Sequence, residues 1–128
     1  METLIITNNE RVKIEFSDRY QVEYYKDASQ MDILKMARDQ IHLGAKLIIH
    51  PMMGRIKPHE TPFKSVFLEN VKGELHMISL TIIEDSINET NKFLTNTYKI
   101  KYEEKDFKDL AYIDYLLIKS GIEEYEHD

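Results

Sequence analysis

Residues 46–68 read KLIIHPMMGRIKPHETPFKSVFL and contain two short apolar segments separated by a loop. The first segment, 46–49, predicts a β-strand, and its unbroken apolar run is typical of a strand buried on both faces. The second segment, 65–68, predicts another strand. The loop between them, the twelve residues 52–63, shows no helical pattern, whereas a parallel pair usually needs a crossover of about a dozen residues or more, most often a helix. The two strands are therefore free to pair antiparallel, and the sheet is either largely parallel or mixed.

Strand and helix patterns alternate on both sides of this stretch. The elements expected before it are a strand at 4–6, a helix at 10–16, a strand at 21–25 and a helix that begins after Ser29 and ends before Gly44. After it we expect a turn at Gly73, a helix at 78–94, a short fifth strand near 98–102, a helix at 107–122 and a frayed acidic tail at 123–128. This alternation predicts an α/β fold for the single domain 1–128. The expected architecture is a layered domain with a largely parallel, or else mixed, four- to five-stranded sheet flanked by helices, in a Rossmann-like or flavodoxin-like arrangement.

Local signals predict where the helices begin and which side of each faces the core. Ser29 followed by Asp32 fits a capping box, and Asn8 or Asn9 can cap the helix at 10–16. Gly44 stands where a helix often ends in the left-handed conformation. The apolar residues expected to face the core are Val12 and Phe16, then Met31, Leu34, Ala37 and Ile41, and finally Leu80, Ile83, Ile87 and Leu94.

Composition excludes several classes of protein. The chain has 128 residues, a net charge of −6 and no cysteine, so disulfides, thiolate metal sites and thiol chemistry are ruled out. The acidic charge argues against binding to nucleic acid or to an anionic membrane. No apolar segment approaches the roughly 20 residues of a membrane span, and the first residues do not resemble a signal peptide. We therefore expect a cytoplasmic protein.

The segment from His50 to Ser65, which contains this loop, is also where groups capable of chemistry concentrate. It holds all three prolines of the chain, which restrict its backbone, and His50 and His59 are two of the five histidines. Between His50 and Ser65 three cations stand against one acid, so a locally basic loop on an acidic protein can attract an anion. The residues of this segment that we assign to a ligand-binding site are His50, Gly54, Arg55, Lys57, Glu60, Thr61, Lys64 and Ser65.

A second polar segment, formed by Thr7, Asn8 and Asn9, follows the expected strand at 4–6. In open α/β sheets, ligands bind beyond the carboxyl ends of the strands. If the strands that precede Thr7 and His50 are parallel neighbours, the two polar segments meet at one edge of the sheet. A helix that begins after Asn9 would add backbone N–H donors. We therefore predict a cleft that binds a small carboxylate or phosphate ligand and contains all three residues of the second segment.

Known catalytic signatures are missing from the sequence. It contains no GxGxxG, GxxxxGK[ST], GxSxG or HExxH motif. His50 is the candidate catalytic residue, because histidine titrates near neutral pH. We expect no cofactor and no metal site, since the spacing of His50, His59 and Glu60 does not bring three ligands together. Structural interpretations also stay open: a rigid connection for the loop, a helix cap for the asparagine pair and a hydrogen-bonding role for His50.

The sequence resembles the GrdX family, small proteins encoded with the glycine, sarcosine and betaine reductase systems of anaerobic amino-acid-fermenting bacteria. The matching stretches span most of the chain and are IITNN at 5–9, IHLGAKL at 41–47, HP at 50–51, Gly54, KP at 57–58, ETPFKS at 60–65 and IIEDSI at 82–87. The chain departs from the family pattern at Glu10, where the family tends to have proline, and around Gly54, where it tends to have small residues. Because of the second departure, the family pattern supports Lys57 as an anion ligand better than it supports Arg55.

The resemblance implies a setting in the reductive fermentation of glycine and related amines. Reductases of that system use thiol and selenol carriers, and a chain without cysteine cannot carry electrons or a substrate group through sulfur. Our leading hypothesis is a non-catalytic accessory or ligand-sensing protein with a reductase-complex protein as partner. One alternative is a small enzyme that uses His50 as acid and base, with Lys57 and Lys64 stabilising an anionic substrate. The other is a structural or interaction module, whose C-terminal tyrosines would support a homo-oligomer.

Overall fold

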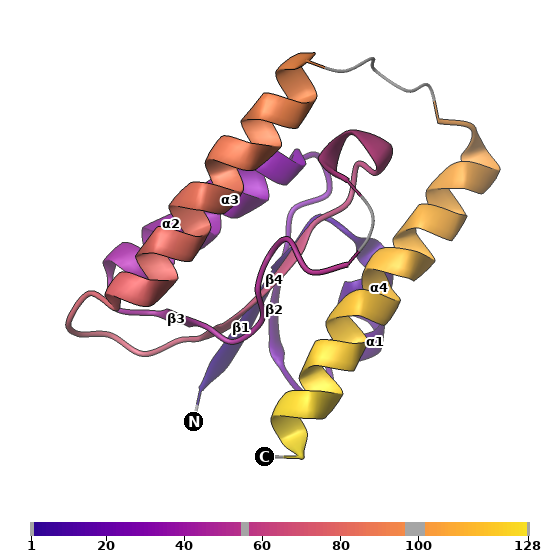
Figure 1. Cartoon of the computed structure of the whole chain (residues 1–128). Coiled ribbons are helices and arrows are strands. Elements are labelled where there is room, and N and C mark those ends of the chain that lie inside the picture. The colour runs from indigo at the N-terminus through magenta and orange to yellow at the C-terminus, as the bar shows by residue number, and fades with distance from the viewer. Residues whose placement is uncertain (1, 55–56, 97–101, 128) are drawn as a thin grey trace.

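Among the residues that the structure describes, four strands form one sheet in the order β2-β1-β4-β3 (Figure 1). They are β1 (Thr3–Thr7), β2 (Gln21–Tyr24), β3 (Lys46–Leu47) and β4 (Ser65–Glu69). The helices are α1 (Glu10–Phe16), α2 (Gln30–His42), α3 (Met77–Asn96) and α4 (Glu104–Glu126), with a 3-10 helix, η1 (Pro58–Glu60), between β3 and β4. This computed structural model describes residues 2–54, 57–96 and 102–127, and no helix in these ranges is both long and apolar enough to cross a membrane.

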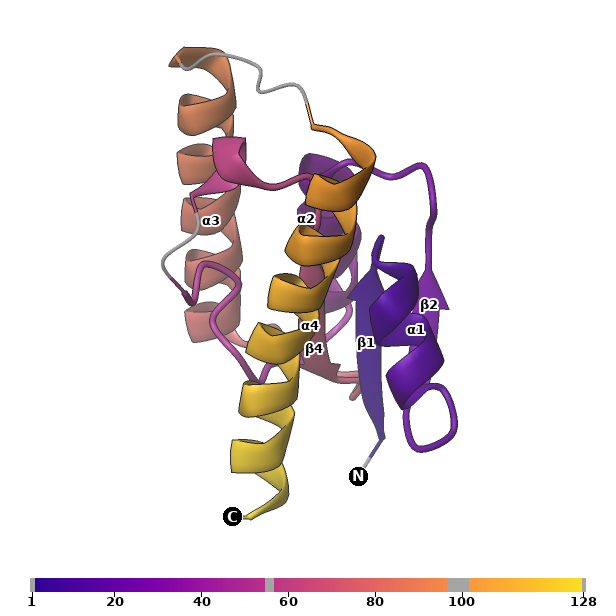
Figure 2. The same cartoon turned by 90° about the vertical axis from the view of Figure 1, so that its right-hand side faces the viewer.

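Strands β1 and β4 lie in the middle of the sheet and are buried on both faces. Leu4 and Ile6 of β1 pack with α2 and α3, whereas Ile5 between them packs with α1 and α4. Phe67 of β4 lies on the same side as Ile5, and its two neighbours in the strand lie on the other side. Because successive side chains of a strand point to opposite faces, this alternation gives three layers, with the sheet between two pairs of helices. Figure 2 shows the connection that contains η1 lying between α3 and α4.

The sheet is mixed, and the expectation of a largely parallel sheet is wrong. Among the described strands only β1 and β2 pair in parallel, while β4 runs antiparallel to both β1 and β3. Apart from η1, the connection from β3 to β4 contains no helix in its described part, so the chain turns back alongside the strand it has just left. The alternative of a mixed sheet is confirmed. The arrangement is not clearly Rossmann-like or flavodoxin-like, because those sheets are mostly parallel.

The signals at helix ends predicted the local structure well. Helix α1 occupies the expected residues, and its N-cap is Asn9. Helix α2 follows Ser29, which forms the expected capping box with Asp32. Gly44 has a φ of 114°, and a Cβ atom there would lie 2.4 Å from the backbone nitrogen of Gly73. The predicted helix end at Gly44 and the predicted turn at Gly73 are therefore in contact, and a side chain on Gly44 does not fit there.

Other details differ from the expectations. Strand β3 has two residues and lies at an edge of the sheet, so Lys46 is exposed and the strand is not buried on both faces. Leu94 does not face the core and is 42% exposed, because the long helix α3 extends beyond the short strands that it covers. The acidic tail is not frayed but continues α4 as far as Glu126, which pairs with Arg19 at 3.3 Å. The fifth strand expected near 98–102 falls almost wholly outside the described residues.

Candidate functional site

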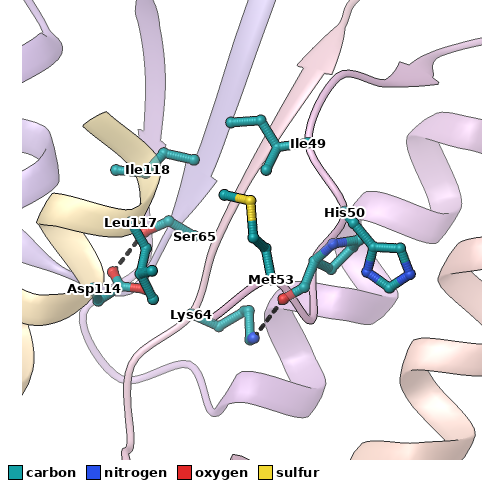
Figure 3. Close-up of a pocket in the computed structure, with 9 residues that line it drawn as sticks. Ile49, His50, Met53, Lys64, Ser65, Asp114, Leu117 and Ile118 are labelled. Atoms are coloured by element: carbon teal, nitrogen blue, oxygen red, sulfur yellow. Dashed lines mark hydrogen bonds between the residues drawn. The ribbon is translucent and has the colours of Figure 1, made fainter. Parts of the chain in front are cut away.

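A pocket lies at the start of β4, between α4 and the loop that follows β3 (Figure 3). Its polar lining residues are His50, Lys64, Ser65 and Asp114, and its apolar ones are Ile49, Pro51, Met53, Leu117 and Ile118. The pocket contains about 310 Å³ of empty space, which includes the part that is open to solvent. The centres of water molecules can occupy about 30 Å³ of this space. That is room for about two water molecules or a small ligand group. Within the described parts of the chain, no three His, Asp or Glu side chains gather closely enough to hold a metal ion.

Asp114 belongs to a hydrogen-bonded ring that joins β1, β4 and α4. Its Oδ2 accepts hydrogen bonds from Ser65 Oγ at 2.8 Å and from Asn9 Nδ2 at 2.9 Å. Ser65 Oγ lies 2.7 Å from Thr7 Oγ1, which in turn accepts the backbone N–H of Asn9 at 2.9 Å. Since Ser65 donates its proton to Asp114, the hydroxyl of Thr7 donates to Ser65. Asn9 Nδ2 also donates to the carbonyl of Ala111 at 2.8 Å, so the ring attaches the start of α1 to α4.

Lys64 brings an amino group to the same pocket. Its Nζ donates to the carbonyl of Pro51 at 2.7 Å, and this is its one hydrogen-bond acceptor among the described residues. No carboxylate in that part of the chain lies within 4.0 Å of Nζ. Burial lowers the pKa of Lys64, and the negative charge of Asp114 opposes that shift. The cation is therefore held in the protein with weak compensation for the water it has lost.

The carboxyl of Asp114 is shifted in the complementary direction. Burial raises its pKa, while the hydrogen bonds from Asn9 and Ser65 and the charge of Lys64 act to lower it. The pocket therefore favours a protonated acid next to a lysine that loses its proton more readily than usual.

Replacing Asp114 with asparagine should change how stability depends on pH. Because the native pKa lies above the ordinary value of 3.8, the contribution of wild-type Asp114 to stability is complete below about pH 4 and is lost as the pH rises through the native value. Asparagine does not ionise. The free energy of unfolding of Asp114→Asn, relative to wild type, should therefore increase across that window, by up to about 1.4 kcal/mol per pH unit. Urea unfolding at about pH 4, 5.5 and 7 measures this change, and a difference that does not vary with pH would contradict it.

His50 lines the pocket from the side of the loop. Its Nδ1 accepts the backbone N–H of Met52 at 3.1 Å, so Nε2 carries the proton in the neutral ring. In Figure 3 the ring lies on the opposite side of the pocket from Asp114. Since β1 and β3 both run antiparallel to β4, His50 lies at the same end of the sheet as the Thr7-Asn8-Asn9 segment. The two strands are not neighbours, because β4 lies between them.

Asn8 fixes the backbone around the pocket. Its Nδ2 donates to the carbonyls of Ala28 and Pro62 at 2.8 and 3.0 Å, and its Oδ1 accepts the backbone N–H of Lys64 at 2.9 Å. All polar atoms of this side chain are therefore used inside the protein, and Asn8 positions Lys64.

Lys57, Glu60 and Thr61 do not line the pocket. Glu60 Oε1 accepts the backbone N–H of Lys57 at 2.8 Å, and Thr61 Oγ1 accepts that of Phe63 at 3.2 Å. The Lys57 Nζ lies 6.0 Å from the centre of the Phe93 ring. These three predicted site residues therefore support η1 and its packing on α3.

Gly54 and Arg55 complete the predicted set. Gly54 has a φ of 105°, and a Cβ atom there would lie 3.0 Å from side-chain carbons of Leu117. It therefore lets the loop approach α4 beside the pocket. Arg55 lies outside the described residues.

Sequence reasoning missed Asp114. The last helix was expected to be apolar on its inner side, and Asp114 precedes the buried Ile118 by one helical turn. An acid on the same face as core residues is the signal that identifies it, because such a group needs hydrogen-bonding partners inside the protein.

Comparison with known proteins agrees with the resemblance seen in the sequence. A family model described as GrdX-like protein matches residues 4–123, nearly the whole length of the chain. No curated protein matches the chain, and no solved structure does. The chain therefore belongs to the GrdX-like protein family.

Proposed function

We propose that this protein binds a small anion, with a carboxylate or phosphate group, at Lys64 and acts as an accessory or ligand-sensing protein. The observation that carries the proposal is the position of the Lys64 amino group, which faces a pocket and has one neutral acceptor, the carbonyl of Pro51, among the described residues. An anion in the pocket would accept further N–H bonds from the charged form and compensate for its lost hydration.

Calorimetric titration with acetate and with inorganic phosphate at about pH 7 tests the proposal. Lys64→Ala should weaken binding by about 10-fold to 100-fold, since a hydrogen bond to a charged group contributes about 1.5–3 kcal/mol. Lys57→Ala is the matched control, because it removes a cation of the same loop that does not line the pocket, and it should leave the affinity unchanged. Equal affinity in wild type and Lys64→Ala, with both folded by circular dichroism, would contradict the proposal.

The setting of this function is part of the same proposal. We assign the protein to glycine, sarcosine or betaine reductase metabolism in the cytoplasm, with a reductase component as its partner, and the family resemblance supports this assignment. The absence of cysteine supports an accessory role, because the chain cannot carry a group through sulfur. Co-purification of the tagged chain from a glycine-fermenting anaerobe should recover a reductase component, and its absence would count against this setting.

A small enzyme is the second candidate. The observation that favours it is the Nε2 atom of His50, which lines the pocket. This nitrogen carries the proton of the neutral ring, because Nδ1 accepts the hydrogen bond from Met52. Such an enzyme would show turnover that disappears in His50→Ala.

A further inference from the structure

The surroundings of Lys64 suit a nucleophilic amine as well as a cation. The pocket wall near its side chain includes Ile49, Met53 and Leu117, which are apolar, and Figure 3 shows the sulfur of Met53 between Ile49 and the lysine. Lysines in apolar pockets are readily deprotonated and are the ones that form Schiff bases with carbonyl compounds. The direction of the Lys64 pKa shift, caused by burial, agrees with this environment.

We propose that Lys64 condenses with a small aldehyde or 2-oxo acid and holds it in the pocket as an imine. This inference rests on the pocket of the proposed function and adds a ligand class to it. The pocket leaves only about 30 Å³ for the centres of water molecules, so it admits only a short ligand, of two or three carbon atoms.

Asp114 supplies the acid that such a condensation needs. The neutral amine of Lys64 adds to the carbonyl carbon, and one of its protons moves to the carbonyl oxygen. The carboxyl group of Asp114 then gives a second proton to that oxygen, which leaves as water. The products are an iminium ion on Lys64 and the carboxylate of Asp114, so charge and atoms balance. Burial raises the pKa of this carboxyl and so favours its protonated form, and the hydrogen bonds from Asn9 and Ser65 then stabilise the carboxylate that remains.

Reductive trapping tests the proposal on the intact chain. The protein is incubated at about pH 7 with glyoxylate or acetaldehyde and cyanoborohydride, which reduces an iminium ion to a stable secondary amine. Peptide mass spectrometry then measures the adduct on each lysine. We expect about fivefold more adduct on Lys64 than on the exposed residues Lys57 and Lys72. Adduct spread over exposed lysines, with Lys64 at or below their level, would overturn the proposal.

A variant separates the role of the acid from that of the amine. Asp114→Asn should slow labelling of Lys64 by about tenfold, because the general acid is lost, while labelling of Lys57 stays unchanged. The change should become smaller as the pH rises through the native pKa of Asp114, because an ionised carboxyl has no proton to donate. Equal rates at Lys64 in wild type and variant would remove Asp114 from the reaction.

The two proposals for this pocket fail in different ways. Acetate binding by calorimetry without an adduct on Lys64 would overturn the imine and leave the anion site standing. An adduct on Lys64 with both carbonyl compounds, without binding of acetate or phosphate, would support the imine and overturn the anion site.

Discussion

Asn9→Ala should lower the free energy of unfolding by about 3 kcal/mol. Asn9 is 1% exposed, caps α1 and donates from Nδ2 to Ala111 and Asp114 of α4. Losing an N-cap costs about 1 kcal/mol, and removing one hydrogen-bond donor from the buried carboxyl of Asp114 and one from the carbonyl of Ala111 costs about 1–3 kcal/mol more. Urea unfolding at neutral pH measures the loss.

Two further variants separate the cap from the bridge to α4. Ser29→Ala removes a cap whose bonds are exposed and should cost only about 1 kcal/mol. Asn9→Asp keeps an acceptor at the cap but loses the Nδ2 donor and places a second carboxylate against Asp114. Its destabilisation should therefore grow as the pH rises and both acids ionise. A loss in Asn9→Ala no larger than that in Ser29→Ala would show that the bridge to α4 contributes nothing.

Phe67→Ala should have the largest effect on stability, about 4 kcal/mol. Phe67 is fully buried in β4, and its ring meets those of Tyr20 and Tyr125 edge to face, with centroids 5.5 and 5.4 Å away. The substitution would remove a large side chain from the contact between sheet and helices, and such cavities cost about 3–5 kcal/mol. Thermal and urea unfolding give the value.

Phe107→Ala is the matched control for this substitution. Phe107 is 42% exposed at the start of α4, so the same chemical change should cost less than about 1.5 kcal/mol. Similar losses in the two variants would mean that the core between sheet, α1 and α4 is not packed as the structure describes.

Structure set by neighbours along the chain could be predicted from the sequence. The capping pattern of Ser29 and Asp32 gave the start of α2, and Asn9 gave that of α1, because each cap is completed within three residues. The direction of β4 depends on pairing with strands far away in the chain. The sequence left that choice open, since the length of the loop permits both directions.

The candidate site could be predicted only in part, because its residues also come from distant parts of the chain. Counting charges singled out the loop and included Lys64, but it weighted Lys57 equally, although only Lys64 faces the pocket. Asn9 and Ser65 belong to the site because both donate hydrogen bonds to Asp114. Asp114 lies more than one hundred positions after Asn9. No local pattern connects residues so far apart, so the acid that organises the pocket could be found only from its buried helical face.

The bonds from Asn9 to α4 also have a consequence during biosynthesis. A growing chain that has emerged as far as β4 already contains Thr7, Asn9 and Ser65, but α4, which supplies Asp114 to their ring, has not yet emerged. The nascent chain folds from its N-terminal part onward, so the pocket closes only after α4 leaves the ribosome and docks. The pocket would therefore form late, and a product truncated before α4 would lack it.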